Sequence, residues 1–417
     1  MTGSPDSPLS LLPDPASKRI ALRVSAPAER ALRQGHPWIF DQAITTQSHA
    51  GAPGDLAVIF DNKRQFLAIG LYDPTSSIRV RILQHHQPAI INSAWFHAKL
   101  LAASQIRSSL LQQETNGYRL VHGENDGLPG MVIDRYAETL VLKIYSPGWV
   151  PHLKEFTSTL LQTIPCERVI LRMSRSLIKQ PEFLHGLEDG MTLAGQPAEG
   201  LILFRENGLT FECDPVHGQK TGFFLDQREN RARVERLSNE RSVLNVFAYT
   251  GGFSVYAARG GAKQVVSVDL SAPALQAAIH NFSHNQHIPA VRSAHHEIIA
   301  EDAFDVLARL GAQKQWFDVV IIDPPMFARN QNQIAAGLSA YKKLTQLGLG
   351  VLRPGGTLVQ ASCSSRINAE TFYDAVHRSA RESNRHLIEI ERTSHAIDHP
   401  IGFDEGAYLK CLFATAS

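Results

Sequence analysis

The segment Val243-Leu-Asn-Val-Phe-Ala-Tyr-Thr-Gly-Gly-Phe253 decides the fold of the C-terminal half of the chain. Its apolar run is typical of a strand, the two glycines predict a tight turn, and a helix is expected to open at Ser254-Val-Tyr-Ala-Ala258. A second apolar run, Gln264-Val-Val-Ser-Val-Asp269, follows. The alternation of strand and helix patterns after Asp226 predicts right-handed βαβ units around a parallel sheet.

The glycine turn predicts a nucleotide-like cofactor. Glycine lets the backbone approach a ligand closely at a helix N-terminus, and an acid about 20 residues later, here Asp269, is placed to bond ribose hydroxyls. The dinucleotide pattern G-x-G-x-x-G is absent, because only Gly251-Gly252 is present, which favours S-adenosylmethionine over NAD. A third strand-like run, Glu297-Ile-Ile-Ala-Glu-Asp-Ala-Phe304, is expected to offer Asp302 and Phe304 to the adenine edge and face. The alternative is that the glycines simply end a strand.

Two further strands are predicted to carry the chemistry. Phe317-Asp-Val-Val-Ile-Ile-Asp323 runs into Pro324-Pro325, and Gly356-Thr-Leu-Val-Gln-Ala-Ser-Cys363 ends in a lone cysteine. Because parallel strands end at the same edge of a sheet, a carboxylate and a thiol would face one substrate. A thiolate nucleophile beside an acid suits methylation of a pyrimidine at C5. Strand-end cysteines are more often inert packing, and the other three are interpreted in that way: Cys166, Cys213 and Cys411.

Composition excludes several classes of protein. The 41 Lys and Arg residues nearly cancel the 40 Asp and Glu residues, so any nucleic-acid surface must be local. Four scattered cysteines match neither a zinc site nor a disulfide scaffold, and a reducing cytoplasm is expected. No secretory leader and no apolar run of about 20 residues is recognised, which argues against secretion and membrane insertion. No metal site is expected, and His122-Gly-Glu-Asn-Asp126 is interpreted as a loop.

The chain divides into an arm and three predicted domains. Prolines and serines over residues 1–17 predict a disordered arm, and short β-like runs over 18–90 predict a small barrel. Residues 91–214 are expected to form a central α+β domain with a hairpin about Asn207-Gly208, and residues 215–417 the α/β domain.

A local basic patch at the start of the barrel is the candidate RNA contact. Lys18, Arg19 and Arg23 lie near Trp38 and Phe40 in the sequence, and cations with an exposed aromatic ring would suit phosphates and bases. For Trp38 and Phe40 themselves, the favoured interpretation is that both rings are buried in the core of the barrel. Arg228 is a candidate phosphate contact of the second half. Its neighbours Arg231, Arg233 and Arg236 are interpreted as a solvated, salt-bridged helix face, and His295-His296 as surface.

The chain resembles the class I S-adenosylmethionine-dependent RNA cytosine-C5 methyltransferases, specifically the bacterial large-subunit rRNA group with an N-terminal PUA domain. The resemblance runs over nearly the whole chain. It is carried by His36-Pro-Trp-Ile-Phe40, Gly127-Leu-Pro-Gly130, Lys220-Thr-Gly-Phe-Phe-Leu-Asp-Gln-Arg-Glu-Asn230, Asn245-Val-Phe-Ala-Tyr-Thr-Gly-Gly-Phe-Ser254, Asp323-Pro-Pro-Met-Phe327, Tyr341-Lys342, Ser362-Cys-Ser364, Asp398-His-Pro400 and Tyr408-Leu-Lys410. One departure is Met326, where members of that group commonly have lysine.

The resemblance implies an α/β fold: a Rossmann-like, seven-stranded class I methyltransferase domain, an N-terminal PUA β-barrel and a central α+β domain. It also implies S-adenosylmethionine as cofactor and 23S ribosomal RNA as partner, and it suggests a homodimer. Catalysis would fall to Cys363 and Asp323. The cofactor residues would be Asp226, Gln227, Phe247, Tyr249, Gly251, Asp269, Asp302 and Asp323.

Two other functions stay open on the sequence. One is a methyltransferase of the same fold that acts on a guanine or adenine nitrogen, for which Cys363 would be dispensable. The other is a catalytically silent RNA-binding assembly factor, against which the intact Asp269, Asp323 and Cys363 argue.

Overall fold

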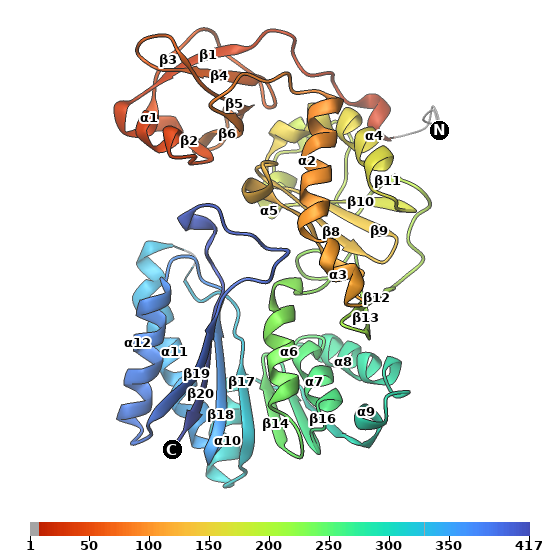
Figure 1. Ribbon diagram of the computed structural model, residues 1–417, viewed down its shortest axis with the longest axis vertical. Helices are drawn as coiled ribbons and strands as arrows, with labels where there is room; N and C mark the ends of the chain where they lie inside the picture. The colour runs from red at the N-terminus through yellow and green to blue at the C-terminus, as the bar shows by residue number, and fades with distance from the viewer. Residues whose placement is uncertain (1–7, 329) are drawn as a thin grey trace. The chain divides into compact units, whose positions relative to one another are not determined.

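The computed structural model describes residues 8–328 and 330–417 (Figure 1). The chain divides into two units, which are considered one at a time. The first comprises residues up to Gly208 with Cys213–Phe223 and Ile397–Asp404, and the second comprises Leu209–Glu212, Phe224–Ala396 and Glu405–Ser417. The second unit thus corresponds broadly to the predicted α/β domain.

The second unit is built on the seven-stranded sheet expected from the βαβ pattern. Its order is β16-β15-β14-β17-β18-β20-β19. Neighbouring strands from β16 to β18 are parallel, and β20 is antiparallel to both β18 and β19. The strands are β14 (Ser242–Val246), β15 (Gln264–Val268), β16 (His295–Ile299), β17 (Phe317–Ile322), β18 (Leu352–Ser362), β19 (Leu387–Thr393) and β20 (Lys410–Ala416).

Helices cover both faces of this sheet, which explains why its central strands are apolar on both sides. Figure 1 shows α11 and α12 on one side and α6, α7 and α8 on the other. Tyr341, Leu344 and Phe372 of α11 and α12 belong to one buried cluster with Leu244 and Ile322 of the sheet. The helices are α6 (Arg228–Arg236), α7 (Gly252–Arg259), α8 (Ala272–His284), α9 (Pro289–Ser293), α10 (Ala303–Ala312), α11 (Ile334–Gly350) and α12 (Ala369–Glu382).

The N-terminal module of the first unit is a six-stranded sheet of order β2-β6-β5-β4-β1-β3. The short β-like runs expected over residues 18–90 include β4, β5 and β6, and a short helix, α1 (Ala26–Arg33), begins after Ser25. Its own core contains Ile20, Leu22, Ile39 and Ile59. The strands are β1 (Ile20–Val24), β2 (Trp38–Phe40), β3 (Ile44–Gln47), β4 (Leu56–Phe60), β5 (Phe66–Tyr72) and β6 (Ile78–His85).

The central module of the first unit is a five-stranded sheet of order β11-β10-β9-β8-β7. Trp149 and Phe156 are fully buried in its core, and Leu71 and Leu83 of the N-terminal sheet belong to the same cluster. The predicted boundary at residue 90 is therefore crossed by a continuous core. The elements are α2 (Ser93–Ile106), α3 (Ser108–Gln112), β7 (Gly117–His122), β8 (Met131–Tyr136), β9 (Thr139–Ile144), α4 (Leu153–Thr163), β10 (Arg168–Met173), α5 (Arg175–Ile178) and β11 (Thr192–Ala194).

The hairpin predicted about Asn207-Gly208 is confirmed. β12 (Ile202–Glu206) and β13 (Leu209–Cys213) form a two-stranded sheet. Asn207 and Gly208 have φ values of 49° and 78°, the left-handed backbone that a tight hairpin turn requires.

The disordered arm predicted over residues 1–17 is wrong in its second part. Residues 1–7 lie outside the described residues. Pro8–Leu11 form a 3₁₀ helix, and Leu9 and Leu12 are buried in the core of the first unit. The prediction weighed the prolines and overlooked these two leucines, whose burial contributes about 1.5–3 kcal/mol each.

No helix among residues 8–328 and 330–417 is both long enough and apolar enough to cross a membrane.

Candidate active site

The glycine turn after β14 has the strained geometry of a ligand-binding loop. Phe247 and Tyr249 have φ values of 63° and 49°, which non-glycine residues adopt rarely, and Gly251 has a φ of 75°. A Cβ atom on Gly251 would lie 2.7 Å from the Cβ of Ala278 in α8, so this position tolerates only glycine. The loop is thus held tightly against α8 just before α7 begins at Gly252.

Asp269 fixes this loop from the end of β15. One carboxylate oxygen accepts a hydrogen bond from the backbone N–H of Tyr249 at 2.8 Å, and the other accepts from the N–H of Ser271 at 2.9 Å. A carboxylate offers about four lone-pair positions, so these two bonds leave capacity for two ribose hydroxyls. The position and the remaining hydrogen-bonding capacity of Asp269 fit the ribose of S-adenosylmethionine.

Two buried polar atoms beside the loop supply an independent test of that fit. Among the described residues, Thr250 Oγ1 and Asn245 Oδ1 have no hydrogen-bond partner. Unsatisfied buried polar atoms are rare in folded proteins and concentrate where a ligand or water completes the network. The residues of the loop therefore fit a polar ligand such as the amino-acid portion of the cofactor.

Hydrogen-bonded polar side chains connect the strand and the helix on either side of the loop to the next two strands of the sheet. Asn245 Nδ2 donates to Ser254 Oγ at 2.9 Å, and Ser254 and Ser267 share a hydrogen bond of 2.7 Å. Ser267 Oγ contacts His296 Nε2 at 2.9 Å. The His296 ring stacks on Phe282 with 3.8 Å between centroids, and burial lowers its pKa to about 4. His296 is therefore half-buried, whereas His295 is exposed as expected.

Asp302 lies at the N-terminus of α10 and not within a strand. Its Oδ1 accepts hydrogen bonds from Phe304 N at 2.9 Å and Asp305 N at 3.3 Å, so it caps the helix while its side chain stays exposed. The predicted role at the adenine stays a prediction.

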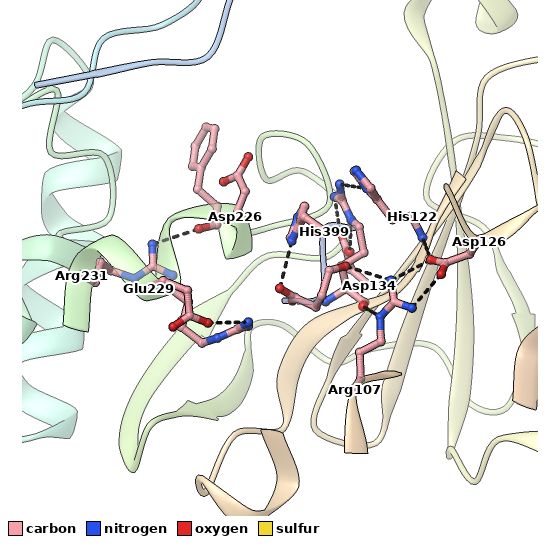
Figure 2. Close-up of polar contacts among 12 residues, drawn as sticks. Arg107, His122, Asp126, Asp134, Asp226, Glu229, Arg231 and His399 are labelled. Carbon is pink, nitrogen blue, oxygen red and sulfur yellow. Dashed lines mark hydrogen bonds and ion pairs between the residues drawn. The ribbon is translucent and has the colours of Figure 1, made fainter. Parts of the chain in front are cut away.

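The segment with Asp226 and Gln227 is buried in the second unit. Tyr408 Oη donates to Asp226 Oδ2 at 2.9 Å. The preceding Phe224 packs edge-on against Tyr249 of the cofactor loop, with 5.0 Å between ring centroids. Figure 2 shows Asp226 with Glu229 and Arg231 of the following helix. The segment is thus tied to the cofactor loop through an aromatic pair.

Arg228 cannot serve as the predicted phosphate contact. Its side chain is 0% exposed, and Nη2 donates to Glu229 Oε1 at 3.3 Å. Arg231 is also buried and donates to Phe224 O at 2.9 Å, whereas Arg233 forms the expected exposed ion pair, with Glu391. The helix pattern therefore identified a salt-bridged face correctly for Arg233 but missed that the first turns of α6 are covered.

The carboxylate and the thiol predicted to share a substrate follow adjacent strands. Ile322 is paired with Gln360 in the parallel ladder of β17 and β18. Asp323 directly follows Ile322, and Cys363 directly follows Ser362, the last residue of β18. Cys363 Sγ donates to Pro324 O at 3.9 Å. The structure thus brings the thiol against the backbone of the Asp-Pro-Pro segment.

Aromatic and hydroxyl groups close this edge of the sheet. Tyr341 Oη donates to Ser362 Oγ at 2.8 Å, and burial raises the pKa of Tyr341. Phe327 lies edge-on to Tyr341 with 5.2 Å between centroids. Met326, where the resembling group has lysine, is 39% exposed and brings no charge to the edge.

Lys410 is a charged residue of this edge to which the sequence pattern assigned no role. It opens β20 opposite Ser362, and its side chain is buried. The sequence signal that could have identified this residue is a lysine at the start of the apolar run Lys410-Cys-Leu-Phe-Ala414. Burying a charge in such a strand is costly unless hydrogen bonds or another charge compensate it.

The predicted RNA residues lie on the N-terminal sheet. Lys18 and Arg19 are exposed before β1, and Arg23 lines a cavity of about 460 Å³ with Phe60 and Arg64. Sequence reasoning missed Arg64, because it belongs to the turn between β4 and β5 and meets Arg23 only through β1–β4 pairing. The nearby Arg33 is already paired with Glu29 and Asp61.

Trp38 and Phe40 are not in the barrel core, contrary to the favoured interpretation. Ile39 between them is buried, whereas Phe40 is 44% exposed. Trp38 Nε1 donates to Glu124 Oε1 at 2.9 Å, and its ring lies edge-on to Phe403 with 5.1 Å between centroids. Alternation along β2 therefore placed the aliphatic residue inside.

A buried ion-pair cluster connects the motifs around Asp126 and Asp398 (Figure 2). Arg107 forms a bidentate pair with Asp126, at 2.7 and 2.8 Å, and also donates to Asp398 O at 2.9 Å. Asp398 accepts from Arg119 N at 2.9 Å and contacts His399 Nδ1 at 3.0 Å. The motifs around Asp126 and Asp398 thus hold Ile397–Asp404 within the first unit.

Comparison with known proteins agrees with this architecture. Residues 119–414 match the S-adenosylmethionine-dependent methyltransferase family, and residues 22–85 match the PUA-like domain. A ribosomal RNA large subunit methyltransferase of Deinococcus radiodurans is 44% identical over 96% of this chain and 98% of its own length. A ribosomal RNA large subunit methyltransferase I of Pseudoalteromonas translucida is 35% identical over 94% and 98%.

Solved structures show the same fold. A Streptococcus mutans protein assigned as a SAM-dependent methyltransferase superposes with a TM-score of 0.80 at 21% identity, covering 95% of this chain and 99% of its own. A second structure, of a methyltransferase-assigned protein complexed with SAH, gives the same TM-score and identity. Full-length similarity above 30% identity, together with the family match over most of the chain, establishes the family. The chain belongs to the S-adenosylmethionine-dependent methyltransferases, in the family of the ribosomal RNA large subunit methyltransferases.

Proposed function

We propose that the protein transfers a methyl group from S-adenosylmethionine to C5 of a cytosine in large-subunit (23S) ribosomal RNA. The observation that carries the proposal is the contact of Cys363 Sγ with the backbone oxygen of Pro324, the residue after Asp323, at the edge where two neighbouring parallel strands end. The names of the full-length relatives supply the class of RNA.

C5 of cytosine needs activation before it can accept a methyl group. Attack of the Cys363 thiolate at C6 breaks the C5–C6 double bond and makes C5 nucleophilic, which splits one difficult step into two. Asp323 would bind the N3/N4 edge of the base and, by supplying a proton at N3, would stabilise the adduct as negative charge develops there. Once C5 carries the methyl group, transfer of the C5 proton to a base re-forms the C5–C6 double bond, breaks the C6–S bond and releases the Cys363 thiolate. S-adenosylmethionine supplies the electrophilic methyl group when bound.

The residues expected to hold the cofactor surround the end of β14. Asp269 would take the ribose, and the loop from Phe247 to Gly251 would enclose the amino-acid end. Asp226 and Gln227 would complete the site from the segment tied to Tyr249 through Phe224. Asp302 is proposed at the adenine.

The RNA would be held in part by the N-terminal sheet. Arg23 and Arg64 line one cavity with Phe60, which suits a phosphate together with a stacked base. Lys18 and Arg19 extend the same positive surface along the chain before β1.

The test of the proposal is covalent trapping. RNA containing 5-fluorocytidine should form a stable adduct with the wild-type protein in the presence of S-adenosylmethionine, because fluorine at C5 blocks the elimination step. Cys363→Ser should form no adduct and should lose turnover while still binding cofactor. Cys166→Ser, which removes the half-buried cysteine of the first unit, is the matched control and should behave as wild type.

A different product would contradict this assignment. If Cys363→Ser retains near-wild-type methylation and the modified nucleoside is not 5-methylcytidine, the enzyme methylates a ring or amino nitrogen. If neither protein methylates ribosomal RNA under conditions where cofactor binds, the silent assembly factor is the better description.

A further inference from the structure

Lys410 places a cation in the interior next to the proposed nucleophile. Its side chain is 3% exposed, and it is paired with Ser362, the residue before Cys363, across the antiparallel ladder of β18 and β20. A buried ammonium is costly unless it is compensated by charge or hydrogen bonds. Its retention at this point therefore calls for a local function.

The hydrogen bonds of Lys410 reach the segment that follows the cysteine. Nζ donates to the carbonyl oxygens of Ser364 and of Ile367, the latter at 2.6 Å. Ser364 is held in addition by its own Oγ, which donates to Ala328 O at 3.0 Å. The lysine thus pins the turn on which the thiol is presented.

The positive charge of Lys410 has no carboxylate partner among residues 8–328 and 330–417, since its Nζ donates to neutral carbonyls. Four titratable groups lie close enough at this edge for their charges to interact: Asp323 after β17, Tyr341 of α11, Cys363 after β18 and Lys410 of β20. Cys411, the residue after the lysine, is buried and is influenced by Asp323. Of these groups, Asp323 disfavours a thiolate and Lys410 favours one.

Lys410 and Cys363 each affect the pKa of the other. Burial lowers the pKa of Lys410 to about 8, and the negative charge of Cys363 acts in the opposite direction by stabilising the ammonium. By linkage, a cation that is stabilised by a thiolate stabilises that thiolate by the same free energy. At neutral pH the lysine is still mostly protonated, so the support is present where the enzyme would work.

We propose that Lys410 is a positioning residue for Cys363, which holds the turn after the cysteine and favours the thiolate form of the nucleophile. The proposal rests on the proposed role of Cys363. It concerns the state of the thiol before RNA binds, and therefore it can be measured without turnover.

The experiment is alkylation of the full-length protein by iodoacetamide across pH 5–10, with the modification of each cysteine read by peptide mass spectrometry. In the wild type, Cys363 should react with a midpoint clearly below the ordinary thiol value of about 8.5. Half-buried Cys166, whose thiol pKa is raised by burial, is the internal control and should react with a higher midpoint.

Removal of the cation should change only one of these curves. Lys410→Met should raise the Cys363 midpoint and slow its alkylation at pH 7 by about tenfold or more, as expected when a charge is removed at short range in a poorly solvated site. Lys410→Arg should keep the midpoint low, and the exposed-site control Lys314→Met should match wild type. Cofactor binding shows whether each variant is folded.

Two results would overturn the proposal. One is a wild-type Cys363 midpoint at or above 8.5, which needs no variant. The other is a folded Lys410→Met protein whose Cys363 curve is unchanged. The outcomes also separate this inference from the methylation chemistry: if Lys410→Met shifts the curve while Cys363→Ser still methylates RNA, the thiolate support stands and the C5 mechanism fails.

Discussion

The carboxyl edge of the seven-stranded sheet and the face of the N-terminal sheet use charge in opposite ways. At the sheet edge, Lys410 is buried and Tyr341 and Cys411 have pKa values raised by burial. On the N-terminal sheet, Lys18, Arg19 and Arg64 are exposed. Desolvation strengthens charge interactions and suits bond making, whereas solvated cations suit a long, salt-sensitive contact with phosphates.

The largest expected effect is on cofactor affinity, and it tests the carboxyl edge of the seven-stranded sheet. Asp269→Ala removes the carboxylate that both fixes Tyr249 N and faces the proposed ribose. Binding of S-adenosylmethionine should weaken by about 1.5–3 kcal/mol, the range for hydrogen bonds to a charged group. Isothermal titration calorimetry measures this affinity. Asp305→Ala, in the first turn of α10, is the control and should bind the cofactor as wild type does. Unchanged affinity in a folded Asp269→Ala protein would remove Asp269 from the site.

The next effect is a pH dependence of the free energy of unfolding, which tests the cost of removing His296 from water. His296 has its pKa lowered to about 4, so the unfolded chain binds the proton more readily. Its contribution to stability is complete above pH 6.5 and is lost as the pH falls from 6.5 towards 4. Between pH 7 and 5 the loss should be about 2 kcal/mol. Urea unfolding of wild type and His296→Gln should show it, with exposed His295→Gln as control. Equal acid sensitivity of wild type and His296→Gln would contradict the assignment.

The smallest expected effect is on the salt dependence of RNA binding by the exposed arginines of the N-terminal module. Arg23→Gln and Arg64→Gln should each lower the slope of log affinity for ribosomal RNA against log salt by about 0.7–0.9, because each substitution removes one cation that neutralises a phosphate. Cofactor affinity should not change. Arg33→Gln, which removes an arginine already paired with Glu29 and Asp61, is the control. An unaltered slope in both variants would show that this cavity holds no phosphate.

Point substitutions are preferable to removal of the whole N-terminal sheet. Leu56, Ile69, Leu71 and Leu83 of that sheet belong to the same buried cluster as Trp149 of the central module. Truncation at residue 85 would expose this core, because apolar surface that is buried in the intact chain would face water. Its effects on RNA binding could not be separated from effects on folding.

The sequence by itself determined the sheet and the residues at which its strands end. Apolar runs that end in Gly251, Asp269, Asp323 and Cys363 are local patterns, and parallel strands must end at one edge, so these residues were predictable without coordinates. The hairpin at Asn207-Gly208 followed from turn chemistry in the same way.

Only the tertiary structure decided which charged and aromatic residues are buried. Arg228 and Lys410 look like surface cations in sequence, yet both are buried. His296 looks exposed and Trp38 looks like a core residue, yet both are half-buried. Burial depends on elements that are distant in the chain, such as the β18–β20 pairing that sets Lys410 opposite Ser362. The free energy of a charge depends on the solvent that those distant elements exclude, and no local pattern records it.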